Sequence, residues 1–165
     1  MQGHLVFGSN LGDRAAQIDA ALTALPVHGV AVHAVSSRYE TAPVGPVAGQ
    51  PPYLNGACAI ETDLDPEALL DALKAIEADL GRPAPGTPGY VDQGPRPIDL
   101  DIALLGPLTV TTERLTVPHP ALLERRFALI PLLELDFALA LPDGRRLSDA
   151  LAVLPIEGQD VRRAG

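Results

Sequence analysis

The sequence predicts an α+β sandwich that resembles the ferredoxin-like βαββαβ arrangement, with a mainly antiparallel sheet covered by helices. Three observations lead to this fold class. Runs with strand character occur near residues 5–7, 30–39, 54–62 and 98–105. Two segments with helical spacing of apolar residues lie after the first and third of these runs. Pro and Gly cluster in the connections between them.

The first strand and helix follow from spacing and chain breakers. The apolar run at residues 5–7 stops at the turn residues 8–10. Residues 13–25 then carry apolar side chains at helical spacing, and we expect Pro26 to end that helix. Alternation from residue 30 through to Tyr39 predicts one strand, after which residues 41–52 are too rich in Pro and Gly for regular structure.

The second helix has the clearest limits. Asp65 is a favourable N-cap, Pro66 suits the first helical position, and Glu67 places a carboxylate where the helix dipole favours it. Gly81 provides the stop. The apolar stripe of this helix consists of Leu69, Leu73, Ile76 and Leu80.

In the second half of the sequence we expect a long loop, a strand and shorter elements. Residues 82–97 are rich in Pro and Gly, and so long a loop inside a compact domain is either disordered or functional. A strand at 98–105 ends in a turn at 106–107. We expect a helix after residues 118–120 that continues to Ile130, where Pro131 limits or kinks it. Further on, a hairpin turn at 143–144 precedes a short helix capped by Ser148.

Composition bounds the class of protein. A chain of 165 residues, 47% hydrophobic, fits one domain over residues 1–165 and, by default, a monomer. No run approaches the about 20 apolar residues that cross a bilayer, and the start lacks a signal sequence, so we expect a cytoplasmic protein without membrane contact. The net charge of −9 argues against nucleic-acid partners. Cys58, the only cysteine, excludes an internal disulfide and is best explained as a buried thiol.

The sharpest chemical signal is the pair Asp99 and Asp101 in an otherwise apolar strand. Side chains two residues apart on a strand point the same way, so both carboxylates share one face. Their mutual repulsion and desolvation call for a cation, and Mg²⁺ commonly joins carboxylates to substrate phosphates. Taken alone, the pattern is equally consistent with a solvated sheet face.

Basic residues near the two acids strengthen the first interpretation. Arg96 precedes the acids, and Arg114, His119 and Arg125 follow within a short stretch. Metal plus arginines is the constellation of phosphoryl transfer, in which the protein positions the reactants and offsets charge on phosphate oxygens. Each arginine separately could equally form a surface ion pair, and His119 could be a helix cap.

Five separated blocks occur in an order that resembles the 6-hydroxymethyl-7,8-dihydropterin pyrophosphokinase family, over nearly the whole chain. The blocks are residues 7–13, 36–43, 53–57, 94–102 and 115–120. The resemblance implies an α+β fold, ATP as donor, a reduced pterin alcohol as acceptor, two Mg²⁺ ions, and AMP plus the pterin diphosphate as products. It further implies in-line attack of the pterin hydroxyl on the β-phosphorus.

Carried onto matching positions, the resemblance also implies site residues. Asp99 and Asp101 would hold both metal ions and act in catalysis together with Arg82 and Arg96. Glu77, expected on the helix surface near the nucleotide, could also be an ordinary solvated carboxylate. The implied ATP contacts are Glu77, Arg96, Arg114, Leu115, Thr116, His119 and Arg125. The implied pterin pocket consists of Gly8, Thr41, Ala42, Pro43, Val44, Tyr53, Asn55 and Phe127, with Tyr53 and Phe127 alternatively plain core residues.

The chain departs from the family in the loop 82–93, where relatives carry more arginines and often a tryptophan. We expect this loop to be mobile without substrates and to close over ATP. Lys74 stands where relatives often have a neutral amide. Two other interpretations compete with the enzyme: a catalytically silent pterin- or nucleotide-binding module, which the thinned loop favours, and a plain interaction domain.

Overall fold

The computed structural model describes residues 1–41, 51–82 and 97–164. A six-stranded sheet has the order β5-β1-β4-β3-β8, with β2 also paired to β4, and all of these pairings are antiparallel. Its strands are β1 Gln2–Ser9, β2 Val30–Val35, β3 Tyr39–Thr41, β4 Tyr53–Thr62, β5 Asp99–Leu104 and β8 Val161–Arg163. A two-stranded sheet pairs β6 Val110–Thr111 with β7 Thr116–Val117.

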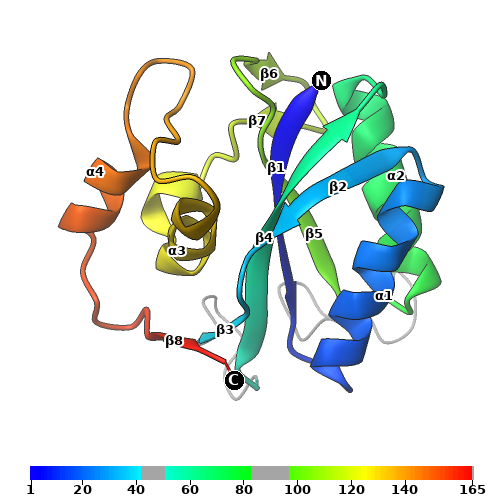
Figure 1. The fold of residues 1–165 in the computed structure, drawn as a ribbon, viewed down its shortest axis with the longest axis horizontal. Coiled ribbons are helices and arrows are strands. Elements are labelled where there is room, and N and C mark those ends of the chain that lie inside the picture. The colour runs from blue at the N-terminus through cyan, green and yellow to red at the C-terminus, as the bar shows by residue number, and fades with distance from the viewer. Residues whose placement is uncertain (42–50, 83–96, 165) are drawn as a thin grey trace.

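Helices cover both faces of the main sheet. Helices α1 Arg14–Val27 and α2 Pro66–Asp79 pack on one face, and α3 Arg126–Leu135 and α4 Leu147–Val153 lie on the other (Figure 1). The chain order through β5 is strand, helix, strands, strand, helix, strand, with β4 and β5 flanking β1. This is the ferredoxin-like arrangement that the sequence predicted, so the predicted fold class is confirmed.

Strand alternation divides the core between these two faces. Leu5 and Phe7 of β1 pack with α1 and α2, whereas Val6 between them packs with α3. Ile18 of α1 and Leu69 of α2 are fully buried on the first side, as are Leu129, Leu132 and Leu147 on the second. The sheet is therefore buried on both sides along β1.

Helix α2 forms as predicted. The Asp65 carboxylate caps it by accepting a hydrogen bond from Ala68 N at 2.8 Å, and Pro66 occupies the first turn. Gly81 has a φ of +95°, which a residue without a side chain adopts at no steric cost. The predicted end of the helix is therefore confirmed.

Two predicted boundaries are wrong. Pro26 does not end α1, because it lies in the last turn, and the helix stops where Gly29 adopts a φ of +86° and its N–H bonds to the Pro26 carbonyl. Ser148 does not cap α4. That helix begins one residue earlier, after Arg146, and no side chain accepts a hydrogen bond there. Burial of Leu147 fixes its first turn.

Two predicted continuous elements are broken. The strand expected from Val30 through Tyr39 splits into β2 and β3, because the Ser36 hydroxyl takes the Ala57 N–H at 2.9 Å. The helix expected after Pro120 is a 3₁₀ turn, Leu122–Glu124, followed by α3, with extended backbone at Arg125. The amide of Arg126 bonds instead to Gln159 Oε1 at 2.9 Å, a partner that local periodicity does not reveal.

Candidate active site

One row of paired residues crosses the sheet and carries the predicted site. Gly8 of β1 is paired with Asn55 of β4 on one side and with Asp99 of β5 on the other. Two pairs further along, and so on the same face, Val6 is opposite Asp101. Paired residues of an antiparallel sheet project to the same face, so the Asn55 carboxamide and both carboxylates face the side that packs with α3.

The two aspartates differ in environment. The pKa of Asp101 is raised to about 7, mainly by burial and also by the neighbouring charges of Asp99 and Glu77, while the charges of Arg125 and Lys74 oppose this rise. The Asp99 side chain keeps 22% of its surface exposed. A carboxylate whose charged form is disfavoured by its surroundings and by other negative charges favours a nearby cation, and the metal site expected from the strand pattern stays a prediction.

Glu77 belongs to this acidic group and is not on the helix surface as expected. Only 2% of its surface is exposed, and its Oε2 accepts a hydrogen bond from Leu100 N at 2.8 Å. Strand β5 is the edge strand, and this N–H points away from β1. The same oxygen lies 2.6 Å from Arg82 Nη1, which is also 2.9 Å from Asp99 Oδ1. Glu77 therefore connects α2 to the strand that bears the aspartates, and the solvated-carboxylate alternative is wrong.

A cleft of about 260 Å³ lies between α2, β5 and the segment around the β6–β7 hairpin. It brings together four of the residues expected to contact ATP, together with Asp101. Arg114 is half exposed there and forms ion pairs with Glu67 at 3.1 Å and with Asp71. The lining residues are Leu70, Lys74, Leu100, Asp101, Ile102, Glu113, Arg114, Leu115, Thr116, His119 and Pro120.

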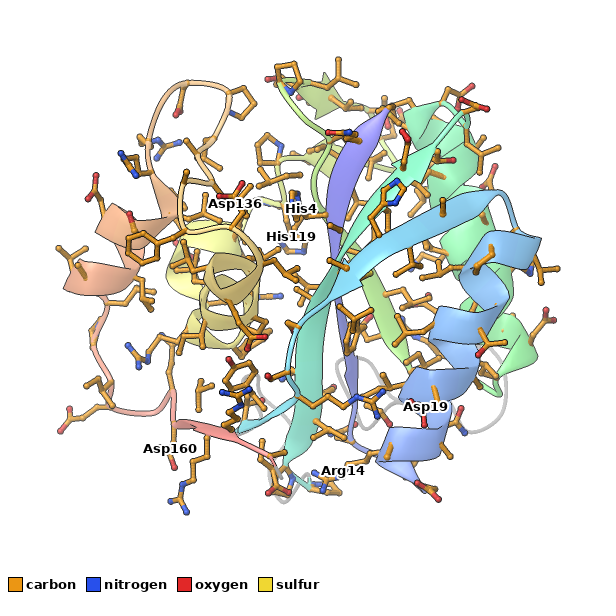
Figure 2. All side chains as sticks on the ribbon, in the orientation of Figure 1. His4, Arg14, Asp19, His119, Asp136 and Asp160 are labelled. Atoms are coloured by element: carbon orange, nitrogen blue, oxygen red, sulfur yellow. The ribbon has the colours of Figure 1, made fainter. Side chains whose placement is uncertain are left out.

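His119 lies between helix α3 and the sheet (Figure 2) and lines both this cleft and a small neighbouring cavity of about 20 Å³. Its Nδ1 accepts the Ala121 N–H at 3.1 Å, but the 3₁₀ turn that follows has no side-chain cap, so the alternative role of His119 as a helix cap is wrong. Burial lowers the pKa of His119, and the charge of Arg125 adds to this. A neutral ring with Nδ1 as acceptor carries its proton on Nε2, which is then a donor.

The pterin side of the predicted site lies at β1, β3 and β4. Asn55 is buried, and its Nδ2 donates to Thr41 Oγ1 at 2.5 Å. A Cβ at Gly8 would lie 2.2 Å from Asn55 Oδ1 and 3.3 Å from the Tyr53 ring, so only glycine admits these side chains. Phe127 lines the small cavity beside Asp101, with the Arg125 guanidinium 5.5 Å from its ring centre.

Four predicted site residues, Ala42, Pro43, Val44 and Arg96, lie outside the described residues, as does most of the loop 82–93. In the part of the chain that the structure describes, no three His, Cys, Asp or Glu side chains gather as a complete metal site. Two carboxylates nevertheless fit Mg²⁺, because this ion is commonly held by one or two carboxylates together with substrate phosphates and water.

Among the described residues, no helix combines the length and the apolar character that a membrane span requires.

Sequence reasoning missed how deeply Glu77 is buried and that Leu70 and Glu113 line the cleft. A signal for Glu77 was present, because it follows Leu73 by four residues and Leu69 by eight, on the apolar side of α2. The position of Glu113 depends on the β6–β7 hairpin, whose two-residue strands are too short for periodicity to reveal.

An α+β sheet with two carboxylates on an edge strand, beside a cleft with basic side chains, defines the class of phosphoryl-transferring enzymes. Comparison with known proteins identifies the family. The family model "7,8-dihydro-6-hydroxymethylpterin-pyrophosphokinase (HPPK)" matches residues 4–137, and the chain belongs to this family. Its activity is the pyrophosphokinase reaction on hydroxymethyldihydropterin in folate biosynthesis, with ATP as the donor. The predicted family and enzyme class are thereby confirmed, against the silent module and the interaction domain.

Relatives of several sizes support this assignment. The 2-amino-4-hydroxy-6-hydroxymethyldihydropteridine pyrophosphokinase of Pseudomonas aeruginosa is 44% identical, over 94% of this chain and 93% of its own. The Bacillus subtilis enzyme of the same name is 44% identical, over 80% of this chain and 76% of its own. The Schizosaccharomyces pombe folic acid synthesis protein fol1 is 43% identical over 94% of this chain, which spans only 21% of that protein.

Solved structures agree with the fold. The Plasmodium falciparum HPPK-DHPS wild-type structure matches 92% of this chain with a TM-score of 0.67 at 14% identity. This chain spans 44% of that longer chain. At this identity the likeness bears on the fold alone.

Proposed function

We propose that this chain carries out the transfer with ATP in the cleft between α2 and β5 and the reduced pterin over Asn55 and Gly8. The observation that carries the proposal is the register of the sheet, which sets Asn55, Gly8 and Asp99 side by side. The hydroxymethyl group of a pterin held at Asn55 would then face the acidic pair. The reacting atoms would meet between β1 and β5.

Two Mg²⁺ ions would be held by Asp99 and Asp101 together with the phosphates. When bound, magnesium draws charge from phosphate oxygens and orients the chain of phosphates. The protein groups have other tasks. Arg114, Arg125 and the Nε2–H of His119 would offset phosphate charge, and backbone groups at Leu115 and Thr116 would border the adenine. Arg82 and Arg96 would act in catalysis, and Glu77 and Arg96 would contact ATP.

On the pterin side, the amide of Asn55 would read the ring edge, because an amide donates and accepts at once. The Thr41 hydroxyl accepts a hydrogen bond from Asn55 Nδ2, and this bond fixes the orientation of the amide. Tyr53 and Phe127 would cover the ring faces, and Ala42, Pro43 and Val44 would complete the pocket.

In the reaction, the pterin hydroxymethyl oxygen loses its proton to solvent and bonds to the β-phosphorus, and the bond from that phosphorus to the α–β bridging oxygen breaks. AMP leaves in line with the attacking oxygen. Because two phosphates move together, the nucleotide product is AMP and not ADP. The monomeric state and the cytoplasmic location stay predictions.

AMP release with and without 6-hydroxymethyl-7,8-dihydropterin tests the proposal. We expect pterin-dependent AMP from the wild type and a loss of at least about a thousandfold in kcat for Asp99→Ala or Asp101→Ala, since both would lose metal ligands. Asp149→Ala, an exposed aspartate of α4, makes the same charge change and should keep wild-type turnover. Turnover near the wild-type rate in either site variant would remove the metal assignment.

A further inference from the structure

One guanidinium nitrogen joins two carboxylates beside the proposed metal site. Arg82 Nη1 lies 2.6 Å from Glu77 Oε2 and 2.9 Å from Asp99 Oδ1. The Arg82 side chain is 19% exposed and that of Glu77 is 3% exposed, so this contact is largely shielded from solvent. Such charge-assisted bonds are among the stronger ones in proteins.

We propose that Arg82 is a built-in counter-ion that occupies Asp99 while no metal is present and gives this carboxylate up when metal binds. The inference rests on the proposed role of Asp99 as a metal ligand. A guanidinium at 2.9 Å from Asp99 Oδ1 and a divalent ion on the same carboxylate would repel each other strongly. Metal therefore has to compete with Arg82 for Asp99.

Glu77 makes this exchange possible without leaving Arg82 unpaired. Glu77 lies on α2, and its carboxylate accepts a hydrogen bond from Leu100 N at 2.8 Å and is 3.3 Å from Lys74 Nζ. The guanidinium can turn away from Asp99 while it keeps Glu77 as its partner. Releasing Asp99 then breaks the ion pair of Arg82 with Asp99 and keeps its ion pair with Glu77, so Arg82 stays beside the cleft.

The surrounding charges support this function of Arg82. Glu77, Asp99 and Asp101 are three acidic groups within one electrostatic cluster, and among the described residues Lys74 and Arg125 are further basic groups that act on Asp101. Like charges so close together destabilise the folded protein unless a cation lies among them. Arg82 provides that cation in the free enzyme. We therefore expect the protein alone to bind metal weakly, and metal to enter together with a nucleotide that adds phosphate ligands.

Binding of Mn²⁺ to the nucleotide-free protein, measured by electron paramagnetic resonance, tests the proposal without any activity readout. Mn²⁺ takes the same oxygen ligands as Mg²⁺. Arg82→Gln should bind Mn²⁺ at least about tenfold more tightly than the wild type, because one positive charge next to the ion is gone. Arg145→Gln is the matched control, since it removes one arginine from an exposed pair with Asp143 and should leave the affinity unchanged.

The outcomes separate the two assignments. If Asp99→Asn weakens Mn²⁺ binding and Arg82→Gln leaves it unchanged or weaker, the metal site stands and the counter-ion function of Arg82 is wrong. If Asp99→Asn binds Mn²⁺ like the wild type, the metal assignment fails, and the inference fails with it. Thermal unfolding checks that each variant is folded, and Arg82→Met, which keeps the length of the side chain, gives the same reading should Arg82→Gln unfold.

Discussion

Gly8→Ala places one methyl group at the junction of the two halves of the site. The added Cβ would lie 2.2 Å from Asn55 Oδ1 and 3.3 Å from Tyr53 Cδ1, and the first contact is too short for any real structure. Asn55 is buried and held by Thr41, so its side chain cannot turn away without losing the bond from Nδ2. The substitution therefore displaces the residue that we propose reads the pterin.

The expected magnitude combines three effects. Overpacking a buried site typically costs about 1–3 kcal/mol. Loss of the Asn55–Thr41 hydrogen bond adds about 1 kcal/mol. Replacing a strand glycine by alanine returns about 0.5–1 kcal/mol of chain entropy. We expect a net destabilisation of roughly 1–3 kcal/mol and a pterin Kd that rises at least about tenfold, equivalent to about 1.4 kcal/mol.

A double-mutant cycle with Asn55→Ala isolates the contact. Urea denaturation gives the free energy of unfolding, and calorimetric titration gives the Kd for pterin and for an ATP analogue. Without the Asn55 side chain, Gly8→Ala should cost no more than about 0.5 kcal/mol, and the coupling energy should reach about 1–3 kcal/mol. An equal cost in both backgrounds, or wild-type pterin affinity in Gly8→Ala, would refute the reasoning, and ATP binding should change little.

Three further predictions follow from buried or hydrogen-bonded groups. Glu77→Ala should lower the free energy of unfolding by about 3 kcal/mol, because it removes the acceptor of the Leu100 N–H and one carboxylate of a buried ion pair, whereas Glu77→Gln keeps an acceptor oxygen and should cost less in urea denaturation. Burial raises the pKa of Cys58 to about 12, so its thiol should not react with Ellman's reagent at about pH 8 until the protein unfolds; rapid reaction of the native protein would contradict this. Burial tends to raise the pKa of Glu134, but hydrogen bonds from Tyr39 and Ser37 outweigh it and lower this pKa below 4.5. The stabilisation lost in Glu134→Gln should therefore be complete at neutral pH and should disappear as the pH falls through the lowered pKa, and a Tm difference independent of pH would count against it.

The sequence predicted those parts of the fold that depend on local signals. Asp65 and Gly81 limit α2 through backbone chemistry within a few residues, and the structure places both ends there. The elements whose prediction was wrong depend on partners that are distant in the sequence. Ser36 breaks the strand because Ala57 N lies opposite it, and α3 begins anew because Gln159 supplies an acceptor from 33 residues away. Neither partner can be read from a window of adjacent residues.

The candidate site divides in the same way. Asp99 and Asp101 could be recognised because a period of two is a property of the strand itself. The ion pairs of Arg82 with Glu77 and Asp99 could not, since they require α2 to pack beside the outer edge of β5. The pairing of Gly8 with Asn55 likewise depends on strand register, which residue identities alone do not determine.

Strand register nevertheless follows from the apolar residues, and this couples the core to the site. Phe7 is opposite Leu100 and points into the core beneath α1 and α2, while its neighbour Gly8 is opposite Asp99 on the other face. A slip of β5 by one residue would turn Leu100 out of the core beneath α1 and α2 and turn both carboxylates into it, at a cost of several kcal/mol for each ion. The alternation that builds the hydrophobic core therefore also holds Asp99 and Asp101 toward the cleft. Substitutions that weaken the packing of Leu100 should accordingly impair the acidic site even though this side chain points to the opposite face of β5 from the two carboxylates.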